Sequence, residues 1–179
     1  MTYSLEEFCR DCHQALSADP GAGGREAIRR RVEKLLAEGD FVAAHLGPEV
    51  DAEKRLLHHD PDTGFYVFAH GTDKGDRVGK PHDHGASWAV YGQAIGVTEM
   101  TQWLRMDDGG RDGHAEIEPE RRFRLDPGKA ALFDTGTIHS TAHPLPARWI
   151  RVTGTDLDRI ERYRYDPEKR TMQVMTPVA

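Results

Sequence analysis

Three histidines in two short stretches of this 179-residue sequence have the spacing of metal ligands. His82 and His84 stand one residue apart in a Pro-His-Asp-His segment, where alternation along an extended strand turns both side chains to the same face. His139 follows a glycine turn in a segment that reads as a buried strand. Three neutral imidazoles suit iron, nickel, zinc, copper or manganese, and the ligands alone do not choose among these metals. We predict that the three histidines bind one metal ion.

Arg151 and Tyr91 are candidates for the pocket beside this metal. If Ile150 and Val152 face the outer layer of a sheet, Arg151 between them faces the interior. A buried arginine needs an anionic partner. That partner could be a substrate carboxylate or an internal acid such as Glu99, and both alternatives stay open. A one-residue shift of the strand, which would expose Arg151, is also open. Tyr91 could line the same cavity or be a packed barrel residue.

The remaining histidines are expected to have other roles. His143 lies four residues after the third predicted ligand, and we expect it beside the metal ligands rather than among them. Four further histidines are read as turn or loop residues, the first three at the ends of the strands expected at 56–59 and 65–70, namely His58, His59, His70 and His114.

The elements that position these residues change character at about residue 51. Residues 1–50 predict helices at 4–18, 25–38 and 41–46, with Ser4 as a helix cap and an apolar stripe for packing against a sheet. From residue 51 onward, short alternating segments separated by turns predict an all-β barrel within a single domain, 1–179. The expected strands are 56–59, 65–70, 82–91, 94–104, 123–125, 130–133 and 149–153, then a hairpin of 161–165 and 171–175, with loops at 71–79 and 107–120.

Composition excludes several classes of function. The formal net charge of −6 argues against a broad nucleic-acid-binding surface. No apolar run approaches the roughly 20 residues of a membrane span, and the N-terminus lacks the pattern of a secretory signal, so we expect a cytoplasmic protein. The Cys9-x-x-Cys12-His13 pattern falls on the apolar face of a predicted helix, which favours two free thiols over haem attachment.

The first histidine stretch resembles the first motif of the cupin superfamily. That motif contains His-x-His, then a glutamate and a closing glycine. His82, His84 and Gly96 match it here, whereas Ala89 stands at the glutamate position, or Trp88 on the shorter spacing.

The second stretch resembles the second cupin motif. Gly128, Gly136 and His139 match its spacing, with Asp134 in the place of the proline. Two motifs in register imply a cupin double-stranded β-helix barrel, with the N-terminal helices packed on the outside.

Three histidines without the glutamate resemble the site of the thiol dioxygenases of the cysteine dioxygenase type. In that comparison Arg55 corresponds to the arginine that binds the substrate carboxylate. The family's Ser-x-His-x-Tyr relay is replaced by Trp149, Arg151 and Thr153. The resemblance implies an Fe(II) dioxygenase that oxidises a small thiol or related anionic substrate with O2.

The chemistry of such a site agrees with this implication. Neutral ligands leave Fe(II) with its full charge, which favours an anionic ligand such as a thiolate. Three protein ligands also leave positions for a bidentate substrate and dioxygen, unlike a closed structural site. Two alternatives remain: another metal-dependent cupin enzyme (a C–C cleaving dioxygenase or an isomerase), or a metal- or ligand-binding protein without turnover. Pairing of two copies into a homodimer through edge strands is also open.

Overall fold

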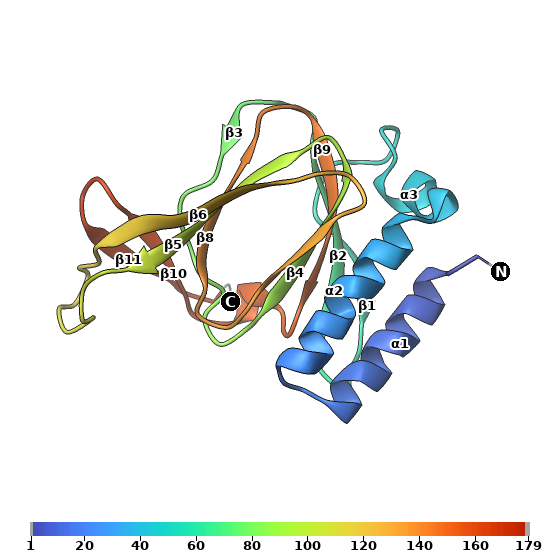
Figure 1. The fold of residues 1–179 in the computed structure, drawn as a ribbon, viewed down its shortest axis with the longest axis horizontal. Coiled ribbons are helices and arrows are strands. Elements are labelled where there is room, and N and C mark those ends of the chain that lie inside the picture. Colours follow the sequence, from blue (N-terminus) through green and yellow to red (C-terminus); the bar gives the residue numbers. More distant parts are fainter. Residues whose placement is uncertain (1, 178–179) are drawn as a thin grey trace.

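The computed structural model describes residues 2–177, in which three helices precede a β-barrel (Figure 1). The elements are α1 Leu5–Ala18, α2 Ala22–Leu36, α3 Gly39–Leu46, β1 Arg55–His59, β2 Tyr66–Thr72, β3 Arg77–Val78, β4 Ala89–Ile95, β5 Thr98–Arg105, β6 Ile117–Leu125, β7 Ala130–Phe133, β8 Ile138–His143, β9 Ala147–Thr153, the short 3₁₀ helix Leu157–Arg159, β10 Arg162–Asp166 and β11 Thr171–Met175.

The barrel is made of two facing antiparallel sheets. One has the strand order β1-β2-β9-β4-β7 and the other the order β3-β8-β5-β6. The chain passes between the sheets repeatedly, so that β2, β4, β7 and β9 lie in the first and β3, β5, β6 and β8 in the second. This is the jelly-roll order, in which neighbouring strands come from distant parts of the chain. The expected double-stranded β-helix is therefore confirmed, and β10 and β11 form the expected hairpin beside it.

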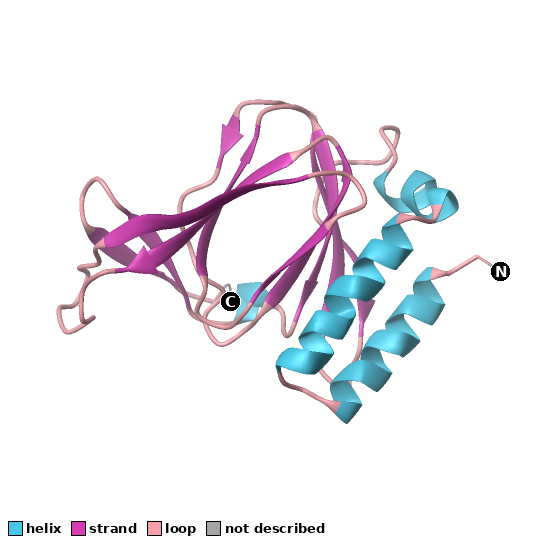
Figure 2. Cartoon of the chain, viewed as in Figure 1, coloured by secondary structure: helices cyan, strands magenta, loops and turns pink. Residues whose placement is uncertain are grey.

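The helices cover the outer face of the first sheet (Figure 2). Helix α1 begins with a capping box, in which the Ser4 hydroxyl accepts from the Glu7 N–H and the Glu7 carboxylate accepts from the Ser4 N–H. Helix α2 packs directly on β4 and β7. Its residues Val32 and Leu36 come so close to the backbone of β4 that a side chain at Gly92 would overlap them. The outer core is therefore closely packed and holds β4 and β9 in position.

Side chains of β9 alternate between the two faces of the first sheet, and the two faces pack against different clusters. Ile150 and Val152 are fully buried in the core shared with the helices. Trp149 instead packs with the interior cluster that contains Tyr91 and Phe133. Because successive side chains point to opposite faces, the odd-numbered residues of β9 line the inside of the barrel.

Several boundaries differ from the sequence prediction. The strand predicted at 94–104 begins at Thr98, after a turn at Gly96 (φ +70°), and the loop predicted at 71–79 contains β3. The strand predicted at 82–91 begins only at residue 89, because Gly85 adopts a left-handed backbone (φ +56°) and starts a turn. Strand β6, Ile117–Leu125, begins within the predicted 107–120 loop. The strand tolerates Pro119 because it lies at the edge of its sheet. Helix α2 begins at Ala22, where the Asp19 carboxylate accepts from the Gly21 N–H and stabilises the start.

Cys9 and Cys12 are both free and buried, as predicted. Burial raises the pKa of each thiol above its ordinary value. Within residues 2–177, no helix combines the length and apolar character needed to cross a membrane.

Candidate metal centre and its pocket

His82 and His139 are joined by their backbones. Each N–H donates to the other residue's carbonyl, at 2.9 Å in both directions. In an antiparallel hydrogen-bonded pair the two side chains lie on the same face, with Cα atoms about 5.5 Å apart. The turn before β8 sets this register, since the Thr137 N–H donates to the Asp134 carbonyl and Gly136 takes a left-handed φ of +77°. The two motifs are therefore aligned by main-chain contacts.

The structure brings His84 to the same point. Its ring centroid lies 4.7 Å from that of His139 and 5.6 Å from that of His82. Each of the three can offer a nitrogen so that all three atoms lie within 4.8 Å of one another. His82 and His84 reach this arrangement from a β-bridge and a turn, however, and not from the regular strand that the sequence predicted.

The unpaired nitrogens of these rings fit a metal. Both ring nitrogens of His139 and the Nδ1 of His84 are buried without a hydrogen-bond partner, which is costly unless a ligand completes them. The Nδ1 of His82 lies 3.0 Å from the Lys80 carbonyl, so this nitrogen carries the proton and Nε2 is left free. Burial lowers the pKa of all three histidines, and the neutral form is the one that binds metals.

The three-histidine group borders a cavity of about 480 Å³. His82 and Tyr91 line it, whereas His84 and His139 lie behind them with exposures of 1% and 0%. Phe133 stacks on His139 with ring centroids 4.1 Å apart and closes the back of the centre. The pocket therefore offers an approach to the site from the His82 side.

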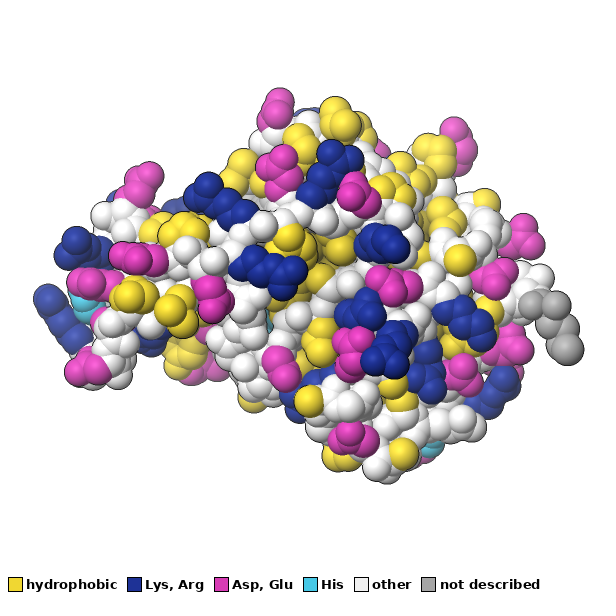
Figure 3. Space-filling model, viewed as in Figure 1, with side chains coloured by type: hydrophobic (Ala, Val, Ile, Leu, Met, Phe, Trp, Pro, Cys, Tyr) yellow, Lys and Arg dark blue, Asp and Glu magenta, His cyan; other side chains and the backbone are white. Residues whose placement is uncertain are grey.

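The wall of this pocket is cationic. It contains five Lys or Arg side chains and no Asp or Glu, the five being Arg77, Lys80, Arg151, Arg162 and Arg164. On the molecular face in Figure 3, acidic and basic side chains are interspersed, in a chain whose net charge is −6. A cavity lined by one sign of charge attracts ligands of the opposite sign.

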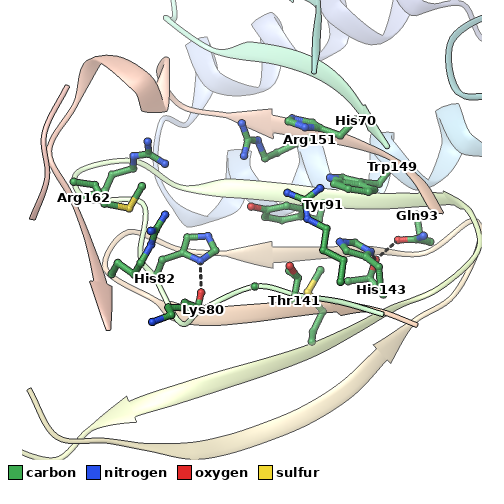
Figure 4. A pocket seen from close by; sticks show the side chains of 16 residues that line it. His70, Lys80, His82, Tyr91, Gln93, Thr141, His143, Trp149, Arg151 and Arg162 are labelled. Carbon is green, nitrogen blue, oxygen red and sulfur yellow. Dashed lines mark hydrogen bonds between the residues drawn. The ribbon is translucent and has the colours of Figure 1, made fainter. Parts of the chain in front are cut away.

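Arg151 takes the interior position, one of the alternatives that the sequence left open. It lines the pocket between Tyr91 and His70 in Figure 4 and makes no ion pair with any of residues 2–177. Its Nε is buried without a partner, and its guanidinium carbon lies 5.6 Å from the Phe68 ring centroid. The internal partner considered from the sequence, Glu99, is exposed on β5 and does not pair with it.

Arg55 lies elsewhere. Its guanidinium donates to the His45 carbonyl at 2.6 Å, and it is not part of the pocket wall. The structure therefore places this arginine, which the family resemblance associates with substrate, at the junction of α3 and β1.

Tyr91 and His143 lie at different depths of the pocket. The Tyr91 hydroxyl is 3.2 Å from the Nε2 of His84, next to the three-histidine group. His143 lies beside Trp149, with ring centroids 4.5 Å apart, and its Nδ1 is 3.1 Å from the Thr98 hydroxyl. His143 is not part of the three-histidine group, as expected.

The sequence reasoning missed several pocket residues. His58, His59 and His70 were read as turn or loop residues at the ends of predicted strands, and they lie within β1 and β2. Of these three, His70 lines the pocket, next to its cross-strand neighbour Trp149. The signal was the alternation of residues 65–70, which puts His70 on the face opposite the outer core. Arg162 and Arg164 were also missed, although they alternate with tyrosines in β10.

Comparisons with known proteins give only remote similarities. No family model matches the chain, and no curated protein matches it. Among solved structures it is similar to KdgF from Halomonas sp., with a TM-score of 0.43 and 20% identity, over 58% of this chain and 83% of that chain. It is also similar to the cupin domain of Schizosaccharomyces pombe Cnp3 (TM-score 0.46, 12% identity, 61% of this chain and 71% of that chain). A third is the DMSP lyase DddQ from Ruegeria pomeroyi DSS-3 (TM-score 0.45, 15% identity, 88% and 78%).

Proposed function

We propose that this protein is a metal-dependent oxidoreductase that uses Fe(II) and O2 to oxidise a small thiol or related anionic compound. One observation carries the proposal: three histidines with unpaired buried nitrogens border a pocket lined by cations and by no carboxylate. If these arginines served only the stability of the fold, we would expect acidic residues of the protein to pair with them.

His82, His84 and His139 would hold the metal. Bound Fe(II) would supply open coordination positions and the redox chemistry that activates dioxygen, and the substrate sulfur is the group that is oxidised. The chain's own contribution begins with Phe133, which packs against His139 and keeps water from the back of the centre. The Lys80 carbonyl holds the proton on the Nδ1 of His82, so the ring presents Nε2.

Arg151 and Tyr91 bind and orient the substrate in this proposal. Arg151 has an unpaired guanidinium in the wall and would form a charge-assisted hydrogen bond with a carboxylate. The Tyr91 hydroxyl, beside His84, can donate a hydrogen bond to an anionic group at the metal end. Both lie on adjacent strands in direct register, so their relative position is fixed by the sheet.

Oxygen uptake tests this function directly. Anaerobically Fe(II)-loaded protein is mixed with a panel of small thiols that carry a carboxylate, and oxygen consumption and product mass are measured. The proposal expects substrate-dependent uptake with addition of two oxygen atoms to sulfur, lost in His139→Ala and retained in a variant of exposed His59. Absence of uptake across the panel by fully loaded protein would contradict it.

A second candidate is a metal-dependent isomerase or C–C cleaving dioxygenase of the same fold. The observation that favours it is the replacement of the relay positions by Trp149, Arg151 and Thr153, because Thr153 donates its hydroxyl to the Thr155 carbonyl and takes no part in the pocket. Product mass separates the candidates: isomerisation leaves the mass unchanged, and carbon–carbon cleavage leaves the sulfur unoxidised.

A further inference from the structure

The sequence of β10, Arg-Tyr-Arg-Tyr, gives this strand two different faces. Tyr163 and Tyr165 belong to or pack against a buried cluster with Ile117 and Ile138 of the second sheet. Arg162 and Arg164 lie on the opposite face and line the pocket. The tyrosines therefore anchor the strand, and the anchoring presents two guanidinium groups to the cavity.

The anchor is attached to the His-x-His segment itself. Asp83, between the two histidines, is buried, and its Oδ2 accepts from the Tyr165 hydroxyl at 2.8 Å. Its Oδ1 accepts from the Gly85 and Tyr163 N–H groups at 2.9 and 3.1 Å. Three donors satisfy this carboxylate, so its role here is to bind β10 rather than a metal.

Main-chain contacts set the register of the hairpin against the metal centre. The Asp83 N–H donates to the Tyr163 carbonyl at 3.1 Å, and the Tyr165 N–H donates to the Pro81 carbonyl at 2.8 Å. Arg164 is thereby the antiparallel bridge partner of His82. Directly opposed residues have Cβ atoms about 4.5–5.5 Å apart, so the side chain of Arg164 starts beside the His82 ring.

The charges of these two arginines are only partly compensated. Arg162 has a side chain that is 15% exposed, its Nε is buried without a partner, and its one acidic neighbour is Asp158 at 3.3 Å. Asp158 also pairs with Lys54. Arg164 is exposed at the mouth side of the wall, and it makes no ion pair with any residue in the described range. Figure 4 shows Arg162 at the His82 end of the pocket, opposite Gln93 and His143.

We propose that Arg162 and Arg164 form an anion-binding subsite at the His82 end of the pocket, so that the substrate carries a carboxylate or phosphate group there, in addition to its metal-binding group and to the group bound by Arg151. This inference rests on the proposed function, because it assigns the substrate class of the same site. Planar guanidinium groups bind carboxylate and phosphate oxygens in pairs, which suits two arginines that face one cavity.

Anion binding to the metal-free full-length chain tests the inference separately from catalysis. Titration calorimetry in 150 mM chloride compares three probes: succinate as a dicarboxylate, inorganic phosphate, and propionate as a monocarboxylate. The variants are Arg162→Gln/Arg164→Gln and, as a matched control, Arg170→Gln, an exposed arginine at the turn of the same hairpin that pairs with Glu116. Thermal melting checks the fold, and the single Arg164→Gln variant replaces the double variant if that one is unfolded.

The inference expects succinate or phosphate to bind the wild-type chain more tightly than propionate, and the tighter of the two identifies the group. The double variant should weaken that probe by about tenfold or more, the control by less than about twofold. Equal weakening by both variants, or unchanged binding in the double variant, would overturn it. Failure of the proposed function would appear differently, as probe binding that is intact in a protein that consumes no oxygen.

Discussion

His143 should make the metal-free protein less stable in mild acid. The ring is 4% exposed, packed against Trp149 and hydrogen-bonded to the Thr98 hydroxyl. Burial, with a smaller contribution from the Arg77 charge, lowers the pKa of His143 from 6.5 to about 4. Between these two pKa values, His143 is therefore mostly neutral in the folded state and mostly protonated in the unfolded state.

The size and pH range of the effect follow from these values. Above pH 6.5 the ring is neutral in both states and costs nothing. As the pH falls below 6.5, the unfolded state binds the proton first, so the free energy of unfolding decreases until about pH 4. A pKa difference of about 2.5 corresponds to about 3 kcal/mol at the acid end of this range.

Urea denaturation of the metal-free protein between pH 4 and pH 8 measures this contribution. His143→Gln keeps a polar side chain in the same place and cannot be protonated, so the loss of stability between pH 8 and pH 4 should be smaller by about 3 kcal/mol than in the wild type. The exposed His59→Gln variant serves as the control and should follow the wild type. If the wild type and His143→Gln lose stability in parallel, the burial argument is wrong.

Three further substitutions probe the scaffold. Gly92→Ala should destabilise the protein by about 1–3 kcal/mol in urea denaturation, because the new Cβ overlaps side chains of α2; an unchanged midpoint would refute the packing described. Arg55→Gln should lower the free energy of unfolding by about 1 kcal/mol, because the hydrogen bond to the His45 carbonyl is lost, and should leave substrate KM unchanged. A raised KM would indicate that Arg55 does bind substrate. Tyr165→Phe should lower the free energy of unfolding by about 1 kcal/mol and weaken metal binding, because it removes the hydrogen bond to Asp83. An unaltered Co(II) affinity would show that the hairpin does not position the metal-binding histidines.

Local patterns were enough to predict much of the fold and the histidine group. The turn before His139 and the His-x-His pair are short-range signals, and two of them at family spacing identify a barrel. The alternation of residues 149–153 indicated an interior Arg151 on the condition that Ile150 and Val152 face the outer core, and the structure meets that condition.

The missed features depend on contacts between distant segments. The register of β10 against Pro81 and Asp83 is set by main-chain hydrogen bonds that no local pattern encodes. Without that register, Arg162 and Arg164 read as surface residues of a hairpin. His70 was missed for a related reason. Which pocket residues it lies beside is known only once β9 is identified as the neighbouring strand.

Metal titration tests the central claim most directly. Metal-free protein is titrated anaerobically with Fe(II) or Co(II), and bound metal per chain is measured together with the absorption spectrum of the cobalt form. The account predicts about one ion per chain in the wild type, an absorption spectrum that changes when an anionic thiol is added, and loss of the ion in His139→Ala. Stoichiometric binding that survives His139→Ala, or no binding by the wild type, would contradict it.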